Sequence, residues 1–447
     1  MSTGFGHIRA LRSVMVPLAC VVGLSACGLF DDDEQLLAGD RIPVRLTTDD
    51  VLTRPEIRAQ IEPLTAPISN SEWTQTNGSS LHVMGHLAGP SSLSVAWTSS
   101  FGDGGGGRGL LTSPPIVVGG SVFMLDAAAK VTAFDASSGA RKWQADLSPE
   151  GEDGEDGFGG GLAFSNGKLL ATTGFGEALA LNPNSGEIEW RLRLTAPARA
   201  APAATKGMMV AVSRDNTAFG VSIADGALLW RVAGASSEAG VLGGASPAIS
   251  ANGVAILPFG SGELVAVNTA NGRRIWSDVL SGGRRGLARS TISDISSDPV
   301  VMGVAVIAGN QSGRLAAFDG RSGRRGWTRD FGASSPVWGE GQTIFVITDD
   351  AKLMRLSGQD GSTMWSTPLR AFRDEDDRED PIGYGGPVLV GGHLVVTSSL
   401  GQVLTFDPIT GEADQTISVS GAAALGPVVA NGTVYVVTEG GSLVALR

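Results

Sequence analysis

The stretch FDASSGARKW, from Phe134 to Trp143, places a glycine four residues after an aspartate and a tryptophan four residues after the glycine. An Asp side chain can fold onto the backbone that follows it and start a turn. Gly139 supplies the positive φ that a tight turn needs. The large Trp ring, on the strand after the turn, suits the space where neighbouring sheets meet. The stretch therefore predicts a tight turn between two strands, followed by a Trp that packs between sheets.

Six further segments align on this glycine, and together the seven copies are 38 to 51 residues apart. This spacing is close to the period of a β-propeller blade. In six copies a Trp follows the glycine by four residues, whereas the last copy has Gln415 there. The aligned glycines are Gly139, Gly186, Gly226, Gly272, Gly323, Gly361 and Gly411, and the tryptophans are Trp143, Trp190, Trp230, Trp276, Trp327 and Trp365.

Three short strand patterns precede each turn and one follows it, which gives four antiparallel strands per repeat. An eighth repeat begins at residue 427, but the chain stops at Arg447, before its last strand. A spare Trp-bearing segment, SLSVAW, ends at Trp97 near the other end. We therefore predict an all-β, eight-bladed propeller of four-stranded antiparallel blades, closed by both termini. Seven blades is the alternative, if the most divergent repeat, 202–230, merges or loops out.

The N-terminus reads as a secretory signal, because Arg9 and Arg12 precede a 13-residue apolar stretch that is too short to span a bilayer. It ends in LSAC, which resembles the bacterial lipobox and makes Cys27 the predicted lipid attachment site. A signal peptide with a chance cysteine is the alternative. We predict a lipoprotein signal peptide over 1–26, a lipidated tether over 27–70 and the propeller over 71–447. Gly28 follows the cysteine, which by the same resemblance predicts the periplasmic face of the outer membrane.

The net charge of −12, without a basic cluster, argues against nucleic acid as a partner. The cysteines are Cys20 and Cys27, and Cys20 would leave with the signal. The mature chain would then have a single cysteine and no disulfide.

The motif A-x-D-x-x-[TS]-G-x-x-x-W resembles the tryptophan-docking repeat of the quinoprotein propellers, over most of Leu93–Arg447. As a whole, the chain resembles the BamB family, the propeller lipoproteins of the outer-membrane β-barrel assembly machine. The lipobox followed by glycine, the one-propeller length and the stretch 291–323 carry this resemblance. It implies a scaffold without a cofactor, anchored by lipid, that binds BamA and other subunits and aids the insertion of outer-membrane proteins. It also makes unfolded outer-membrane proteins candidate clients.

The same resemblance nominates partner-binding residues. In the family, acidic residues of a loop S-D-hydrophobic-x-x-x-P contact BamA, and here Ser293, Asp294 and Ile295 match its start. The family's second acid falls on Ser296, which departs from the pattern. A Leu/Arg loop of the family corresponds to TAPARAAP, 195–202, and nominates Arg199, although its distance to the following proline is about two residues shorter here.

A pyrroloquinoline-quinone-dependent dehydrogenase is the main rival, because those enzymes share the repeat and fold alone does not decide function. Such an enzyme needs Ca²⁺ bound by carboxylate and amide oxygens and an Asp as base. The resemblance implies a vicinal cysteine pair as well, which this chain lacks. We predict no enzyme activity and no cofactor. Binding of peptidoglycan or another envelope component is a third reading.

Two further groups of residues are weak metal candidates. The acidic stretches 151–157 and 373–380 do not match the twelve-residue Ca²⁺ loop, and we interpret them as solvated loops. His82 and His86 have the i, i+4 spacing of a helical metal site, but Gly85 and the strand-rich context argue against a helix there. We interpret both as structural or surface residues and predict no metal site.

Overall fold

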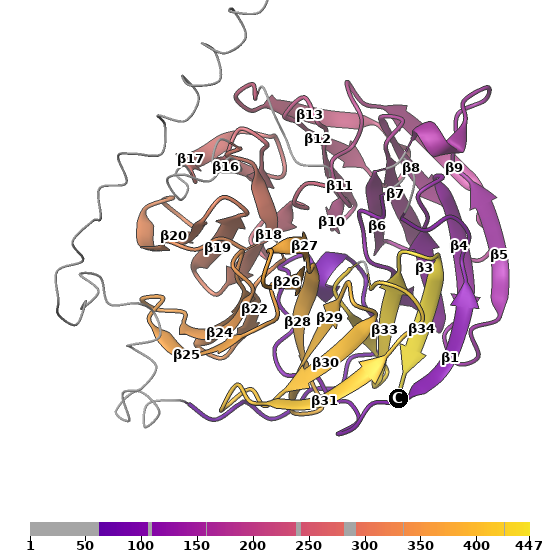
Figure 1. The fold of residues 1–447 in the computed structure, drawn as a ribbon. Coiled ribbons are helices and arrows are strands. Elements are labelled where there is room, and N and C mark those ends of the chain that lie inside the picture. The colour runs from indigo at the N-terminus through magenta and orange to yellow at the C-terminus, as the bar shows by residue number, and fades with distance from the viewer. Residues whose placement is uncertain are drawn as a thin grey trace, which may run out of the picture. The chain divides into compact units, whose positions relative to one another are not determined.

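The computed structural model describes residues 62–105, 110–157, 159–237, 243–280, 292–333, 335–423 and 425–447, all within the compact unit Thr48–Arg447. These residues form 34 strands and two short 3-10 helices, η1 (Thr76–Gly78) and η2 (Gly154–Asp156). In this part of the chain no helix is long and apolar enough to cross a membrane. The strands assemble into eight four-stranded antiparallel sheets, the blades, which surround a centre in Figure 1.

Blades 1 to 4 follow one another along the chain, each running from its innermost to its outermost strand. Their strands are β2 (Ile116–Val118), β3 (Ser121–Leu125), β4 (Lys130–Asp135) and β5 (Arg141–Asp146); β6 (Gly160–Ser165), β7 (Lys168–Thr173), β8 (Glu177–Leu181) and β9 (Ile188–Arg193); β10 (Ala203–Thr205), β11 (Met208–Val212), β12 (Thr217–Ser222) and β13 (Leu228–Ala233); and β14 (Ala248–Ile249), β15 (Val254–Pro258), β16 (Glu263–Asn268) and β17 (Arg274–Val279).

Blades 5 to 7 repeat the pattern, and blade 8 combines the last three strands with the first one. Their strands are β18 (Ile295–Met302), β19 (Ala305–Asn310), β20 (Arg314–Asp319) and β21 (Arg325–Arg329); β22 (Trp338–Glu340), β23 (Thr343–Ile347), β24 (Lys352–Ser357) and β25 (Thr363–Pro368); β28 (Tyr384–Val390), β29 (His393–Ser398), β30 (Gln402–Phe406) and β31 (Ala413–Ser418); and β32 (Val428–Ala430), β33 (Thr433–Thr438), β34 (Ser442–Leu446) and β1 (Val95–Ser100).

The eight-bladed prediction is confirmed, including closure by both ends of the chain. β1 pairs with β34, with Trp97 opposite Ala445, and the two strands lie side by side in Figure 1 as purple and yellow arrows. The seven-blade alternative is wrong, because the divergent repeat forms the complete sheet β10-β11-β12-β13. The three inner strands of each blade are mostly buried, whereas the outermost strand is mostly exposed or partly buried, apart from a buried Trp in four of the blades. Each blade is thus covered on both faces by its neighbours.

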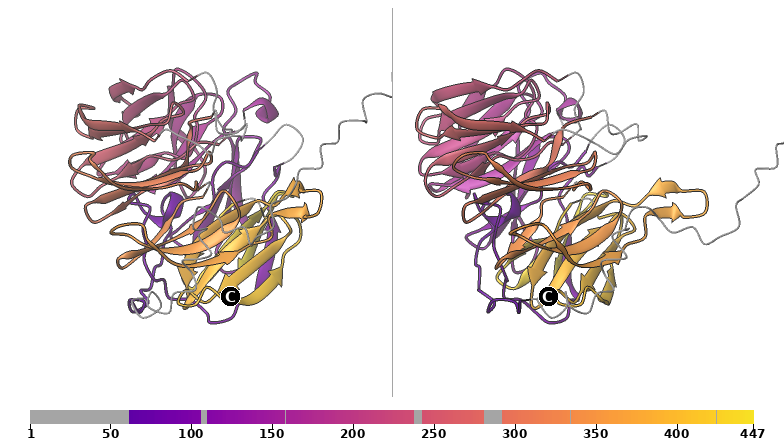
Figure 2. Two further views of the ribbon diagram at one scale, coloured as in Figure 1. Left: turned by 60° about the vertical axis from the view of Figure 1, so that its left-hand side comes forward. Right: turned by 90° about the vertical axis from the view of Figure 1, so that its left-hand side faces the viewer.

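One hairpin belongs to no blade. β26 (Phe372–Asp374) and β27 (Glu379–Pro381) pair between blades 6 and 7 and carry the acidic stretch 373–380. Every residue from 373 to 381 is exposed, and the hairpin extends away from the blades in the right view of Figure 2. The predicted solvated loop is therefore an exposed, acidic β-hairpin.

Residues 70–87, here called the inner belt, line the centre of the ring and contact the innermost strand of every blade in ring order. Asn70 meets blade 8, where its Nδ2 donates to the carbonyl of Val429 at 2.6 Å. Trp73 exchanges two backbone hydrogen bonds with Val117 of blade 1. The other belt contacts are Thr74 with Phe164, Gln75 with Ala204, Ser80 with Ile249, Leu81 with Val301, Gly85 with Trp338 and Leu87 with Leu389.

The inner belt supplies partners for strand edges that face the centre and would otherwise be unpaired. Trp73 stacks on Trp338 at 6.1 Å between ring centroids, so the two tryptophans outside the repeat pack together. The contact with the blades begins before the belt, because the Thr65 amide donates to Glu340 and the carbonyl of Glu62 accepts from Arg355. Residues 62–70, which the sequence analysis placed in the tether, therefore pack on the propeller.

Candidate functional site

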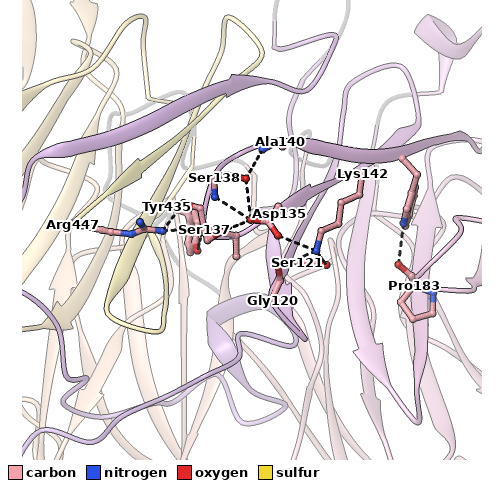
Figure 3. Close-up of polar contacts among 12 residues, drawn as sticks. Gly120, Ser121, Asp135, Ser137, Ser138, Ala140, Lys142, Pro183, Tyr435 and Arg447 are labelled. Carbon is pink, nitrogen blue, oxygen red and sulfur yellow. Dashed lines mark hydrogen bonds and ion pairs between the residues drawn. The ribbon is translucent and has the colours of Figure 1, made fainter.

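The turn of the opening stretch is organised by Asp135 (Figure 3). Its Oδ1 accepts hydrogen bonds from the amides of Ser137 and Ser138, at 3.0 and 3.1 Å, and from both hydroxyls. These bonds hold the pKa of the Asp135 carboxyl well below its usual value. Lys142 lies 3.4 Å from the second carboxylate oxygen. The aspartate therefore shapes the turn locally, as an Asx turn does.

Each repeat glycine contacts a tryptophan of the preceding blade. The seven glycines have φ between 68° and 77°, and a Cβ on any of them would lie 2.5 to 3.0 Å from the nearest Trp carbon. Six of the rings also donate Nε1–H to a carbonyl of the next blade, at 2.6 to 3.1 Å. The pairs are Trp97–Gly139, Trp143–Gly186, Trp190–Gly226, Trp230–Gly272, Trp276–Gly323, Trp327–Gly361 and Trp365–Gly411.

The junction between blades 7 and 8 is different, because the C-terminal Arg447 and the segment before β1 lie where the turn of blade 8 would be. Ser94 and Arg447 exchange two backbone hydrogen bonds there. Gln415 occupies the Trp position of blade 7, and its side chain bonds the amide and the carbonyl of Leu93 at 3.2 and 3.0 Å. The Trp-to-Gln change thus coincides with the loss of the glycine turn.

The partner-binding candidates Arg199 and Asp294 meet each other. Arg199 lies in the loop from β9 to β10 and Asp294 directly before β18, yet Arg199 Nη2 is 2.5 Å from Asp294 Oδ1. Arg199 is 5 % exposed and Asp294 is 0 % exposed. The ion pair therefore joins two inter-blade loops inside the protein.

Two glycines make room for the Arg199 guanidinium. A Cβ on Gly244 would lie 2.3 Å from Arg199 Nε, and a Cβ on Gly260 would lie 2.5 Å from Nη1. The Arg199 backbone is held as well, because its amide donates to Val212 and its carbonyl accepts from Gly244. The charge of Arg199 and burial together lower the pKa of the neighbouring Arg214, burial being the larger cause.

Residues in the loops that carry or adjoin the buried pair are exposed or half-buried. Thr195 and Pro197 are exposed in the first loop, Ala235–Ser237 are exposed in the loop after β13, and Ser293 is half-buried beside Asp294. Asn216 connects the second loop, since its Nδ2 donates to Ala235 and its Oδ1 accepts from the Gly260 amide. We call residues 195–197, 235–237 and 293 the loop platform.

The remaining residues nominated from the sequence differ in their burial and contacts. Ser293 donates its hydroxyl to the carbonyl of Ser261. Ile295 is fully buried in a cluster with Trp276 and Phe318. Ser296 donates to the carbonyl of Ala333. Cys27, the signal peptide and most of the predicted tether lie outside the described residues.

A central cavity of about 330 Å³ lies between the inner belt and the inter-blade loops. The acid among its lining residues, Asp298, was not a candidate from the sequence. Asp298 lines this cavity, where its Oδ1 accepts from the Ser246 amide at 2.6 Å and its Oδ2 from Asn77 Nδ2 at 3.1 Å. Burial raises the pKa of the Asp298 carboxyl to about 7. The sequence shows only that Asp298 directly precedes Pro299, which does not indicate a cavity.

The two histidines of the belt are structural in their geometry. His82 is buried and its Nδ1 lies 2.8 Å from the carbonyl of Pro299, while burial lowers the pKa of its imidazole to about 4. His86 Nδ1 lies 2.8 Å from the carbonyl of Thr65. Neither is on a helix. Within the described ranges, no group of three or more His, Cys, Asp or Glu residues is arranged to hold a metal ion.

Comparison with known proteins identifies the family. The sequence model of the family described as outer membrane protein assembly factor BamB matches residues 127–367 and 374–447. The chain belongs to the BamB family. The BamB of Yersinia pestis is 24 % identical over 440 residues, which cover 97 % of this chain and 98 % of that protein.

Solved structures agree on the fold. BamB from Moraxella catarrhalis superposes with a TM-score of 0.65 at 18 % identity, over 80 % of this chain and 100 % of that one. A quinohemoprotein alcohol dehydrogenase from Pseudomonas putida gives 0.66 at 13 % identity, over 85 % of this chain and 80 % of that one. At such identities the likeness is one of fold, which the BamB family shares with these enzymes.

Proposed function

We propose that this BamB-family protein is a lipid-anchored scaffold that assists outer-membrane protein assembly and docks on BamA through its loop platform. Its relatives are named outer membrane protein assembly factors. The observation that carries the docking proposal is the buried Arg199–Asp294 pair, which joins two of the loops that carry the exposed and half-buried platform residues. Arg199 and Asp294 then act as positioning residues, and the exposed platform residues make the contact.

The electrostatics explain why both charges are needed. A buried ion pair is worth little relative to an apolar replacement, but removing one partner leaves an uncompensated buried charge at a cost of about 3–5 kcal/mol. Gly244 and Gly260 lie against the guanidinium, so Arg199 is held close to both loops. We therefore expect loss of Asp294 to leave the Arg199 charge unpaired inside the protein and to displace the loops.

Co-purification with BamA from detergent-solubilised membranes tests the proposal. We expect Asp294→Ala and the surface variant Ser237→Arg to lose BamA, the first by moving the platform and the second by placing a bulky charged side chain on it. Ser237→Arg also removes the hydroxyl that accepts a hydrogen bond from Asn216 Nδ2 at 3.3 Å. Asp278→Ala is the matched control, because it breaks the exposed Arg325–Asp278 pair and should retain BamA. Full recovery of BamA with Ser237→Arg would rule out the platform as the docking surface.

The lipid anchor has its own test. We propose that residues 1–26 are removed and that Cys27 carries the lipid, with the propeller on the periplasmic face of the outer membrane. Wild-type protein should incorporate labelled palmitate and sediment with outer membranes, whereas Cys27→Ser should do neither. Cys20→Ser is the control and should behave as wild type. Labelling of the Cys27→Ser protein would contradict the assignment.

A further inference from the structure

Among the residues that the structure describes, the central cavity is lined by a buried acid and by no Lys, Arg or His. We call the cavity lined by Asn77, Ser246, Ser296 and Asp298 the socket. Asp298 is 8 % exposed, and among the described residues no Lys, Arg or His forms an ion pair with it. Buried charges in proteins are ordinarily paired, because an isolated one loses its hydration without compensation. The socket thus contains an acid whose natural complement is a cation.

The carboxylate retains capacity to bind. Each oxygen accepts one hydrogen bond, from the Ser246 amide and from Asn77 Nδ2, whereas a carboxylate offers about four acceptor positions. The raised pKa of about 7 reflects how poorly this site tolerates an unpaired negative charge. A cation beside Asp298 would relieve that cost.

The inner belt contributes Asn77 to the lining of the socket. Asn77 lies in η1 and has a φ of 54°, a left-handed conformation that is uncommon outside glycine. This conformation accompanies the contact of its side chain with Asp298. Strained residues of this kind persist where surrounding structure holds them, and they cluster at binding sites. A volume of about 330 Å³ is at the small end of ligand pockets, so one small group fits better than a large cofactor.

The socket lies beside the buried Arg199 that holds the platform loops. Gly244 lines the cavity, and the same glycine bonds the Arg199 carbonyl and encloses the guanidinium. We propose that the socket binds one ammonium or guanidinium group, supplied by a Lys or Arg side chain of the partner that docks on the loop platform or by a free organic cation. The partner source rests on the proposed function, whereas the cation site itself does not.

The first experiment needs no partner. The full-length protein is titrated with methylguanidinium and methylammonium, with neutral methylurea as the matched ligand control, and binding is followed by calorimetry. We expect the cations to bind, methylurea not to bind, and Asp298→Asn to weaken cation binding at least about tenfold. Asp278→Ala, which breaks the Arg325–Asp278 pair outside the cavity and keeps the Asp298 carboxylate, should bind the cations as wild type does. Thermal unfolding of each variant confirms that it is folded.

The second experiment separates the two sources. The affinity of BamA is measured for wild type, Asp298→Asn and Ser237→Arg. A loss of about tenfold with Asp298→Asn shows that the partner supplies the cation, whereas an unchanged affinity together with methylguanidinium binding shows a free cation. The inference is overturned if Asp298→Asn changes neither cation binding nor BamA affinity. Loss of BamA binding by Ser237→Arg in that same case would leave the proposed function standing, so the two failures are distinguishable.

Discussion

Seven blade junctions of this propeller are built alike, and the eighth is not. At the seven, a Trp on the outermost strand covers a glycine of the next blade's turn, as Trp276 covers Gly323. At the eighth, between blades 7 and 8, the turn is replaced by the C-terminal Arg447 and the segment before β1, and Gln415 bonds the backbone of Leu93 in that segment. The ring is therefore closed at one position by polar contacts and elsewhere by aromatic packing.

The difference shows that the Trp and the glycine work as a pair. A Cβ on Gly323 would lie 2.7 Å from Trp276, so the ring approaches this closely only because glycine has no side chain. Where no glycine turn exists, a Trp has no surface to cover. Gln415 instead bonds both the backbone donor and the backbone acceptor of Leu93, as an amide can.

The largest expected effect comes from breaking one of the seven junctions. Trp276→Ala removes a ring that is 7 % exposed, stacks with Phe318 and donates to the carbonyl of Gly320. We expect the free energy of unfolding, measured by chemical denaturation, to fall by about 3–5 kcal/mol. Leu229→Ala, on an outermost strand and 52 % exposed, is the control and should change little. Equal losses in the two variants would contradict the junction account.

The next effect concerns the pH dependence of stability at the centre of the ring. The folded-state pKa of Asp298 is raised to about 7, so its protonated form stabilises the fold at low pH, and that stability is lost as pH rises from about 4 through 7. His82 acts in the opposite sense, because its folded-state pKa is lowered to about 4 and its contribution is lost as pH falls from about 6.5 through 4.

Asp298→Asn isolates the carboxyl contribution. As pH rises from 4 to 8, the free energy of unfolding of the variant should increase by roughly 2–4 kcal/mol relative to that of wild type. Denaturation curves at several pH values measure this difference. Trp276→Ala should shift stability by the same amount at every pH. A constant difference between Asp298→Asn and wild type across this range would show that burial does not perturb the carboxyl.

The smallest effect is expected at the eighth junction. Gln415→Ala removes two hydrogen bonds to Leu93 and should cost about 1 kcal/mol. Gln415→Trp sharpens the comparison, because a tryptophan there would have no glycine to cover and should also destabilise the ring. Thermal unfolding of both variants provides the measurement. A stabilising Gln415→Trp would mean that a Trp packs well without its glycine.

The architecture could be predicted because the repeat is local: Asp135, Gly139 and Trp143 lie within nine residues, and Trp97 accounts for the missing strand. The inner belt could not be predicted from the sequence. Its hydrogen bonds join Trp73 to blade 1 and Leu87 to blade 7, and no repeated residue pattern accompanies them. Such contacts depend on where the ring places its inner edges.

The candidate site was predicted only as separate residues. Arg199 and Asp294 were nominated individually, but their pairing depends on Gly244 and Gly260, which make room for the guanidinium. Burial of both charges follows from the packing of three loops and has no sequence signal. Asp298 escaped notice for the same reason, because only the folded ring makes it line a cavity.

Site-specific photocrosslinking in native membranes tests the central claim, docking through the loop platform, most directly. A photoreactive residue is placed at Pro197 of the platform or, as a control, at Leu229 on the outermost strand of blade 3, both of which are exposed. The account predicts a BamA adduct from position 197 and none from position 229. An adduct from position 229 alone would contradict it.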